Sequence, residues 1–170
     1  MSTLLVRDVR VADAEAISEL YAVYARTSVA TFEFDPPTPQ EWIAKIEASA
    51  AAGRPFLVGT LADEVIGYAY VSPWSPRPGY RHTVEDTIYL AAQHTGRGFG
   101  RLLLAELLRR AAIAGTRQII AVVADTGNPA SVVLHQRVGF EEVGRLRRVG
   151  FKHGRWLDTI LLQRGVDPAP

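Results

Sequence analysis

The order of apolar and polar positions along the chain predicts a mixed α/β domain. Short runs rich in branched and aromatic residues predict strands, and these runs lie at residues 4–9, 56–61, 65–71, 83–90, 118–124, 141–149 and 156–163. Apolar residues at helical spacing predict four helices. The first follows Asp13, the second begins at Thr38, the third covers residues 102–114 and the fourth covers residues 128–138. The resulting order is strand, two helices, three strands, helix, strand, helix and two strands, without an internal repeat.

Local signals sharpen some of these boundaries. Thr38-Pro39-Gln40-Glu41 is a capping box with proline at the first helical position, so a helix begins there, and Gly53 ends it. Residues 27–37 lack a helical period and end in prolines, which predicts a loop. Residues 72–79 hold three prolines, so we expect a stiff loop that joins no sheet. The continuous apolar run at 118–124 predicts a strand buried on both faces.

Length and composition limit the possible functions. A chain of 170 residues is too short for two ordinary domains, so we expect one domain at 1–165 and a frayed tail at 166–170. The 19 basic and 18 acidic residues are mixed along the sequence, which argues against a nucleic-acid partner. The absence of cysteine excludes disulfides and a cysteine-bound acyl group, and it fits a cytoplasmic protein. Neither a signal region, nor an apolar run of about 20 residues, nor metal-ligand spacing is visible, so we expect no membrane span and no metal.

Three glycines at alternate positions, Gly96, Gly98 and Gly100, lie between a predicted strand and a predicted helix. Such a turn points backbone N–H groups outward, and the helix N-terminus adds its positive dipole end, which suits a pyrophosphate. Arg97 and Arg101 add cationic side chains beside the turn. The sequence matches neither a Walker loop nor the dinucleotide-binding pattern of Rossmann folds. Taken alone, these glycines are equally compatible with an ordinary turn.

The residues around this turn resemble the acetyl-CoA signature of the GNAT acetyltransferases. The resemblance lies in residues 93–104 and 85–90, and in residues 128–140, which are similar to the asparagine-containing helix and terminal Gly-Phe of that family. Over nearly the whole chain, the sequence is similar to one branch, the phosphinothricin and methionine sulfoximine acetyltransferases. Segments that match this branch are residues 27–32, 39–42, 72–74, 83–85 and 150–156. Thr95 departs from the family motif, which has glutamine or arginine at that position.

This resemblance implies the GNAT fold, a central and mostly antiparallel sheet with splayed strands, flanked by about four helices. It also implies acetyl-CoA as co-substrate, without a metal. The strand ending at Leu90 would diverge from its neighbour and pair with the pantetheine arm, and residues 96–101 would hold the pyrophosphate. The implied cofactor-binding residues are Ile88, Tyr89, Leu90, Gly96, Arg97, Gly98, Phe99, Gly100, Arg101, Asn128 and Ser131. Members of this branch are usually homodimers, and we expect a homodimer here.

Two titratable residues lie where the resemblance places the chemistry. Acyl transfer to an amine requires a deprotonated amine and a stabilised leaving thiolate, and a chain without cysteine favours direct transfer in a ternary complex. Glu85 would be the base, with a pKa raised by partial burial; the alternative is an exposed strand residue in a salt bridge. His135 would protonate the thiolate or shuttle the amine proton; the alternative is a half-buried helix histidine bonded to a carbonyl. The division of these roles stays open at this stage.

The resemblance further implies a small amino-acid-like acceptor, acetylated on its α-amino group, of the methionine sulfoximine, methionine sulfone or phosphinothricin type. Arg77 would pair with its carboxylate, and Phe32 and Tyr80 would border its side chain. The implied acceptor-binding residues are Phe32, Arg77, Tyr80, Val84, Ala124 and Thr159. Ser75 stands where herbicide-detoxifying members tend to carry lysine. Two other functions stay open, namely acetylation of a protein N-terminus or lysine, and acyl-CoA binding without catalysis.

Overall fold

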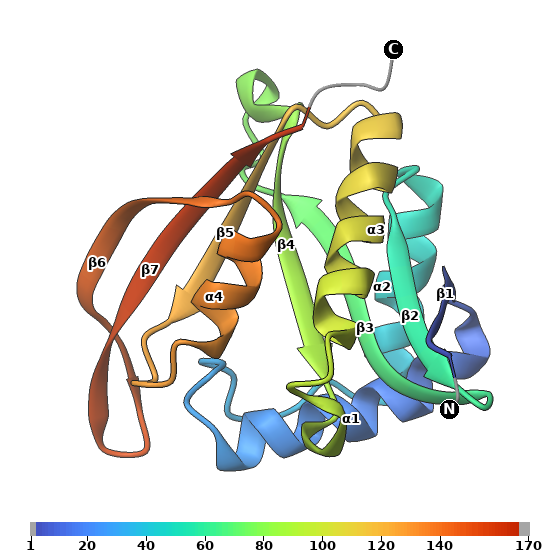
Figure 1. Cartoon of the computed structure of the whole chain (residues 1–170), viewed down its shortest axis with the longest axis horizontal. Coiled ribbons are helices and arrows are strands. Elements are labelled where there is room, and N and C mark those ends of the chain that lie inside the picture. Colours follow the sequence, from blue (N-terminus) through green and yellow to red (C-terminus); the bar gives the residue numbers. More distant parts are fainter. Residues whose placement is uncertain (1–2, 167–170) are drawn as a thin grey trace.

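The computed structural model shows one mixed sheet with helices on both of its faces (Figure 1). It describes residues 3–166. The strands are β1 (Leu5–Asp8), β2 (Phe56–Leu61), β3 (Glu64–Pro73), β4 (Thr83–Leu90), β5 (Gln118–Ala124), β6 (Glu141–Lys152) and β7 (Arg155–Gly165). The helices are α1 (Ala14–Thr27), α2 (Pro39–Ala51), α3 (Phe99–Ile113) and α4 (Ala130–Arg137). The predicted mixed α/β class and the order of elements are confirmed.

The strands are hydrogen-bonded in the order β1-β2-β3-β4-β5-β7-β6. All neighbouring strands are antiparallel except β4 and β5, which run parallel. This parallel pairing joins residues 83–85 to residues 118–120, and the two strands then diverge, as Figure 1 shows. Within residues 3–166, residues 86–90 of β4 therefore have no strand on their β5 side. The predicted splay of the sheet is confirmed, and it leaves backbone groups available next to the glycine turn.

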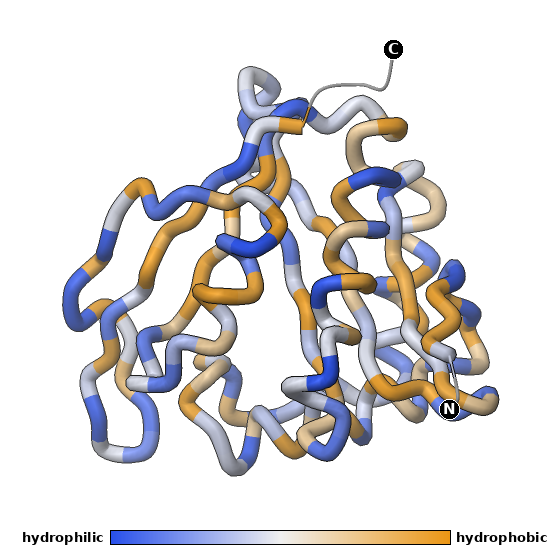
Figure 2. The backbone as a smooth tube through the Cα atoms, viewed as in Figure 1, coloured by the Kyte–Doolittle hydropathy of each residue, from blue (hydrophilic) through white to orange (hydrophobic). Residues whose placement is uncertain are grey.

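Two apolar clusters hold the helices on opposite faces of the sheet. One cluster packs α3 on the central strands, with Leu104 fully buried, and the other packs α1 and α2 on β2 and β3 around Trp42. Figure 2 shows how apolar positions run along the central strands. Because side chains alternate along a strand, β4 contributes to both layers. Val84 and Ile88 join the α3 cluster, and Tyr89 packs against the other.

The predicted proline-rich loop begins later than expected. β3 continues through Pro73, so residues 72 and 73, which were expected to join no sheet, pair with β4. Proline is tolerated at this position because the pairing of β2 with β3 stops at Tyr70, and the far side of residues 72 and 73 is a free edge. A proline without an N–H group fits such an edge. The prediction was wrong because the sequence does not show where the neighbouring strand ends.

Other features of the predicted elements also differ in the structure. Helix α3 begins at Phe99 rather than 102, since Gly98, with φ of 84°, forms its N-cap. The strand at 118–124 is buried on one face, and Val122 on the other face is 39% exposed, because α1 and α2 pack mainly on β2, β3 and β4. Val166, expected in the frayed tail, is buried and donates its N–H to the Arg117 carbonyl at 2.9 Å. Residues 167–170 of the predicted tail lie outside the described residues.

The second helix begins as predicted. The Thr38 side chain accepts a hydrogen bond from the Glu41 N–H at 3.3 Å, and the Glu41 carboxylate accepts one from the Thr38 N–H at 2.7 Å. This reciprocal cap fixes the start of α2 and so directs its inner face toward the sheet. Across residues 3–166, no helix combines the length and the apolar character needed to cross a bilayer.

Candidate active site

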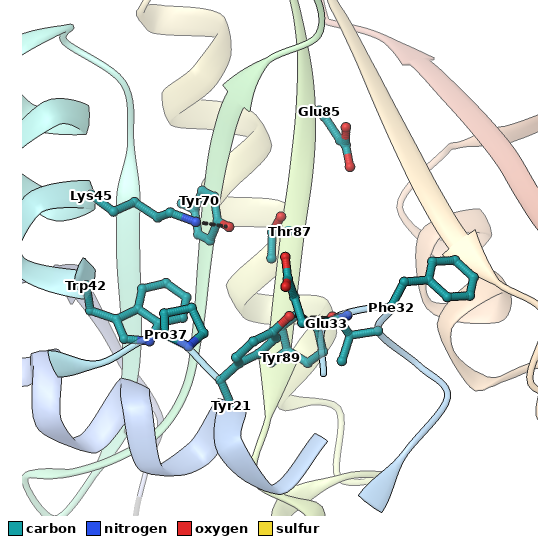
Figure 3. A pocket seen from close by; sticks show the side chains of 11 residues that line it. Tyr21, Phe32, Glu33, Pro37, Trp42, Lys45, Tyr70, Glu85, Thr87 and Tyr89 are labelled. Carbon is teal, nitrogen blue, oxygen red and sulfur yellow. Dashed lines mark hydrogen bonds between the residues drawn. The ribbon is translucent and has the colours of Figure 1, made fainter. Parts of the chain in front are cut away.

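A cavity of about 350 Å³ lies on the face of the sheet that α1 and α2 cover, next to the point where β4 leaves β5. One side is formed by Glu85, Thr87 and Tyr89, which alternate along β4 and therefore point the same way. The other walls come from α1, α2, β3 and the loop at residues 28–37 (Figure 3). They consist of Tyr21, Thr31, Phe32, Glu33, Pro37, Trp42, Lys45 and Tyr70. The cavity is thus built from segments far apart in the sequence.

The loop at residues 28–37 is fixed from both sides. The hydroxyl oxygens of Tyr21 and Thr31 are 2.7 Å apart, and the Lys152 ammonium group on β6 donates to the Thr31 carbonyl at 2.8 Å. Lys152 is fully buried, and burial lowers its pKa. The Phe32 ring lies against Gly150 of β6, where a Cβ atom would stand 2.7 Å from the Phe32 Cδ1 atom. The position of this cavity wall therefore depends on close contact with β6.

Glu85 is a half-buried carboxylate in the wall of the cavity. Burial raises its pKa, and the neighbouring charge of Asp86 raises it further. None of the described side chains donates a hydrogen bond to it or forms an ion pair with it. A carboxylate with a raised pKa, free lone pairs and access to a cavity is suited to accept a proton from a bound amine. The alternative of an exposed glutamate in a salt bridge does not fit this setting.

Asp86 and His135 form a buried pair on the opposite face of β4. The His135 ring is 3% exposed, with Nε2 3.0 Å from Asp86 Oδ2 and Nδ1 2.7 Å from the Ser131 carbonyl oxygen. Because a carbonyl and a carboxylate both accept, each ring nitrogen acts as a donor, which corresponds to an imidazolium ion. Burial alone would lower the pKa of His135, but the hydrogen bond and charge of Asp86, with the Ser131 carbonyl, outweigh it and raise the pKa.

This placement separates the two predicted catalytic residues. Glu85 lines the cavity, whereas His135 lies among α4 and β4 side chains with both ring nitrogens engaged. A histidine bonded to a helix carbonyl was one of the two interpretations of the sequence, and the geometry agrees with it. Asp86 was missed as its partner, although its position next to Glu85 on a strand already assigns it to the opposite face. Asp86 Oδ1 is buried without a hydrogen-bond partner among the described residues.

The glycine turn is open and suited to an anion. Gly96 and Gly98 have φ of 72° and 84°, a conformation that side chains oppose, and nothing lies within 4 Å of the space where their Cβ atoms would be. None of the described side chains caps the N-terminus of α3, so its first N–H groups face this space. The Arg97 guanidinium group lies 4.8 Å from the centre of the Phe99 ring. Gly100 differs from the other two, because its Cβ would meet Leu90 Cδ1 at 3.0 Å.

The remaining predicted cofactor residues lie beside this turn. Ile88, Tyr89 and Leu90 lie on the part of β4 that has left β5, and the turn follows directly. Asn128 precedes α4, and its side-chain oxygen accepts a hydrogen bond from the Ala130 N–H at 3.0 Å. Exposed residues at the N-termini of α3 and α4 complete the set, and these are Arg101 and Ser131. A helix N-terminus and a free strand edge suit a diphosphate joined to an amide-containing arm, which is the chemistry of coenzyme A.

The structure brings one of the six predicted acceptor residues, Phe32, to the cavity. Arg77 and Tyr80 are exposed on the segment between β3 and β4, and neither lines the cavity. Val84 is buried beneath α3, because it is adjacent to Glu85 on β4 and successive side chains on a strand point to opposite faces. Ala124 and Thr159 pair with each other on β5 and β7, beyond the point where β5 leaves β4, and line no part of the cavity. Five of the six residues therefore lie outside this cavity, and their part in acceptor binding stays a prediction.

Several cavity residues were missed. Thr87 and the Tyr89 side chain could have been found, because they repeat every second residue from Glu85 on a predicted strand. The remaining missed residues come from elements whose packing the sequence does not reveal, and they are Tyr21, Thr31, Glu33, Pro37, Trp42, Lys45 and Tyr70. Within residues 3–166 no group of histidine, aspartate and glutamate side chains is arranged to hold a metal.

Comparison with known proteins agrees with this geometry. The family model described as "Acetyltransferase (GNAT) domain" matches residues 6–161. A phosphinothricin N-acetyltransferase of Alcaligenes faecalis is 45% identical over 95% of this chain and 82% of its own length. An L-methionine sulfoximine/L-methionine sulfone acetyltransferase of Pseudomonas paraeruginosa is 38% identical over 96% of this chain and 95% of its own.

A solved structure extends the comparison to three dimensions. The GNAT superfamily phosphinothricin acetyltransferase of Sinorhizobium meliloti, in complex with acetyl-CoA, is 41% identical and superposes with a TM-score of 0.92. The superposition covers 97% of this chain and 89% of that protein. The splayed sheet, the uncapped α3 with its glycine turn, and these similarities lead to one conclusion: the chain belongs to the GNAT family of acetyltransferases, in the branch of the phosphinothricin and methionine sulfoximine acetyltransferases.

Proposed function

We propose that this protein transfers the acetyl group of acetyl-CoA directly to the α-amino group of a small amino-acid-like acceptor of the methionine sulfoximine, methionine sulfone or phosphinothricin type. One observation carries the proposal: Glu85 lies at the end of the β4–β5 pairing, in the wall of an acceptor-sized cavity. On the other face of the same strand lie α3, its glycine turn and α4. The splay between the strands joins the two faces, so that an acetyl donor and an amine can meet beside Glu85.

Glu85 acts as the base in this proposal. An amino acid enters as an ammonium ion, and a proton must leave its nitrogen before the nitrogen can attack. The Glu85 carboxylate accepts this proton directly or through one water molecule, and its raised pKa improves the match to the amine. Acetyl-CoA would supply a thioester whose C–S bond breaks as the new C–N bond forms, and the coenzyme A thiolate that leaves would take up the second proton lost by the nitrogen. Thr87 and Tyr89 line the same side of the cavity and hold the acceptor next to Glu85.

The cofactor is held by backbone groups rather than by a metal in this proposal. The N–H groups at the start of α3, with Gly96 and Gly98, bind the diphosphate. The free edge of β4 at residues 88–90 binds the pantetheine arm as an added strand would. Asn128, Ser131 and the exposed Arg101 border the same site.

The His135–Asp86 pair has a positioning role in the proposed site. It joins α4 to β4 directly behind Glu85, so it keeps the cofactor side and the acceptor side of the strand in a fixed relation. Both ring nitrogens already have acceptors, which argues against a role as proton donor to the leaving thiolate. The two predicted catalytic residues thus divide into a base, Glu85, and a support, His135.

We also propose that the protein is a cytoplasmic homodimer that binds neither nucleic acid nor membranes. Charges of both signs are mixed along the chain, which fits the last point. The dimer is supported by large exposed apolar side chains on the β6–β7 edge of the sheet. They are Val143, Leu146, Val149, Phe151 and Trp156, each at least 46% exposed. Apolar clusters of this kind mark protein interfaces, and the mass of the protein in solution tests the assignment.

A thiol-release assay with acetyl-CoA tests the proposed function. The acceptors are methionine sulfoximine, methionine sulfone, phosphinothricin and a set of short peptides, and mass spectrometry locates the new acetyl group. We expect turnover with at least one of the amino acids and acetylation on its α-amino nitrogen. Turnover with peptides alone would point to protein acetylation. Tight acetyl-CoA binding without turnover of any acceptor would indicate a binding module and refute the proposal.

A further inference from the structure

Lys45 is the one basic side chain among the described residues that line the cavity. Its ammonium nitrogen donates to the Tyr70 hydroxyl at 3.1 Å, and lies 5.0 Å from the centre of the Trp42 ring and 4.9 Å from that of Tyr70. Cations are attracted to aromatic faces at such distances. These three contacts hold the positive charge at one end of the cavity, as Figure 3 shows.

This charge has no acidic partner in the part of the protein that the structure describes. Among residues 3–166, no carboxylate oxygen lies within 4.0 Å of the Lys45 nitrogen, although seven such ion contacts occur elsewhere in that part of the chain. An ammonium group has three N–H donors, and the Tyr70 hydroxyl takes one. The two others are available to a ligand in the cavity.

We propose that Lys45 selects acceptors that carry a second acidic group on their side chain, and that it binds this group together with the Tyr70 hydroxyl. The inference rests on the proposed function, because it takes the acceptor amine to lie at Glu85. Glu33 and Glu85 also line the cavity. Without the charge of Lys45, an anionic side chain would therefore meet two carboxylates and be repelled.

The register of β3 and β4 places Tyr70 and Glu85 near each other in the wall of the cavity. Tyr70 lies directly opposite Thr87, and Glu85 is two residues further along the same face. Diagonal neighbours of this kind are about 7–8 Å apart. Both residues therefore border the same cavity, and the acceptors that test the assignment have two methylene groups between the α-carbon and the acidic group, as glutamate does. The class comprises carboxylates, phosphinates and sulfonates of glutamate length.

Two pairs of acceptors of equal shape test the assignment. L-Homocysteic acid has an anionic oxygen where L-methionine sulfone has a methyl group, and glutamate has an anionic oxygen where glutamine has an amide NH2 group. The ratio of kcat/KM for the anionic and neutral member of each pair is measured in the wild type and in Lys45→Met and Lys45→Arg. Arg137→Met is the control, since it removes a positive charge from an exposed position outside the cavity.

We expect the wild type to prefer the anionic member, and Lys45→Met to lower the ratio at least about tenfold, as loss of a charge-assisted hydrogen bond requires. The loss should appear in the KM for the anionic acceptor, with kcat/KM for methionine sulfone and the KM for acetyl-CoA within about twofold of the wild type. Lys45→Arg should retain the preference, and Arg137→Met should leave the ratio unchanged.

An unchanged ratio in Lys45→Met, or a wild type that acetylates the sulfone but not the sulfonate, would overturn the assignment of Lys45 and leave the acetyltransferase proposal intact. A wild type that acetylates no amino acid at all would instead overturn the proposed function, and the selection of acceptors with it. Thermal unfolding of each variant verifies that it is folded. A folded Lys45→Met that loses both acceptors equally would assign Lys45 to a group that both acceptors share, such as the α-carboxylate, and would refute selection by the side-chain charge.

Discussion

Replacing Gly150 with alanine tests whether β6 sets the position of the acceptor wall. The added Cβ atom would stand 2.7 Å from Phe32 Cδ1 and still closer to two other atoms of the ring. Ordinary carbon–carbon contacts are about 3.5–4.0 Å, so the ring must move by roughly 1 Å or more. The loop that carries Phe32 has little freedom to follow, because the Thr31 carbonyl is held by Lys152 at 2.8 Å. The displacement therefore falls on the wall of the cavity.

We expect two effects of this displacement. Overpacking of this kind destabilises by about 1–3 kcal/mol, which lowers the Tm of a chain of this size by roughly 2–12 °C. A misplacement of about 1 Å near a reacting group lowers the rate by up to about 100-fold, so kcat/KM for the acceptor should fall about 10- to 100-fold. The KM for acetyl-CoA should stay within about twofold, since the proposed cofactor turn lies on the other face of the sheet.

Initial rates of thiol release, with acceptor and acetyl-CoA varied in turn, measure both constants. Gly144→Ala is the matched control, because it lies on the same strand and its Cβ would meet only Leu161 Cδ1, at an ordinary 3.9 Å. The double variant Gly150→Ala/Phe32→Ala should regain stability relative to Gly150→Ala, since the clash is gone. Equal kinetics for the Gly150 and Gly144 variants would refute the reasoning, as would an equal loss of acetyl-CoA and acceptor affinity.

Three other predictions concern the two faces of β4 and the turn. Glu85→Gln should lower kcat by roughly 10²–10⁴-fold without changing acetyl-CoA affinity in calorimetry, and unchanged turnover would remove the base assignment. In the wild type, kcat/KM should fall on acidification through a limb above pH 4.5, because burial raises the pKa of Glu85, and Glu85→Gln should abolish this limb. Gly98→Ala, strained at φ of 84°, should weaken acetyl-CoA binding about tenfold with little change in the acceptor KM. His135→Asn leaves Asp86 buried and unpaired, and should lower the free energy of unfolding by about 3–5 kcal/mol at pH 6. Because the folded-state pKa of His135 is raised, the stability advantage of the wild type is complete below the unfolded pKa of about 6.5 and shrinks as the pH rises through the folded-state pKa. If the difference in urea midpoint between wild type and variant were the same at pH 6 and pH 9, this would contradict the ion pair.

The parts of the fold that the sequence predicted well depend on local signals. β4 and β5 have the predicted bounds, and the capping box of Thr38 and Glu41 gave the start of α2. The start of α3 was predicted three residues late, because a glycine-rich stretch reads as a loop, whereas Gly98 is itself the cap. Burial of β5 on both faces was wrongly predicted, since an apolar run does not reveal how far α1 and α2 extend over the sheet.

The residues of the candidate site also divide into those that the sequence could indicate and those that depend on packing between distant elements. Glu85 could be found because the resemblance to the GNAT family places the chemistry on this strand, next to a recognisable turn. Lys45 and Tyr70 could not, because their meeting depends on how α2 packs on β3 and not on any local pattern. Arg77 was assigned to the cavity by analogy with relatives, but in this chain its segment stays exposed. Side chains that converge from distant elements are thus the part of a site that a single sequence shows least.

The alternation along β4 has a consequence for how this protein tolerates changes in length. Glu85 and Asp86 are adjacent in the chain, yet one faces the cavity and the other lies beneath α4. Deleting a single residue within this strand would invert every side chain beyond it, so that an aspartate would enter the cavity while the glutamate lost its access to it. Insertions and deletions between β3 and β4, at residues 74–81, would leave the alternation of side chains along β4 unchanged. We therefore expect related chains to vary in length there, and β4 itself to keep its residue count unchanged.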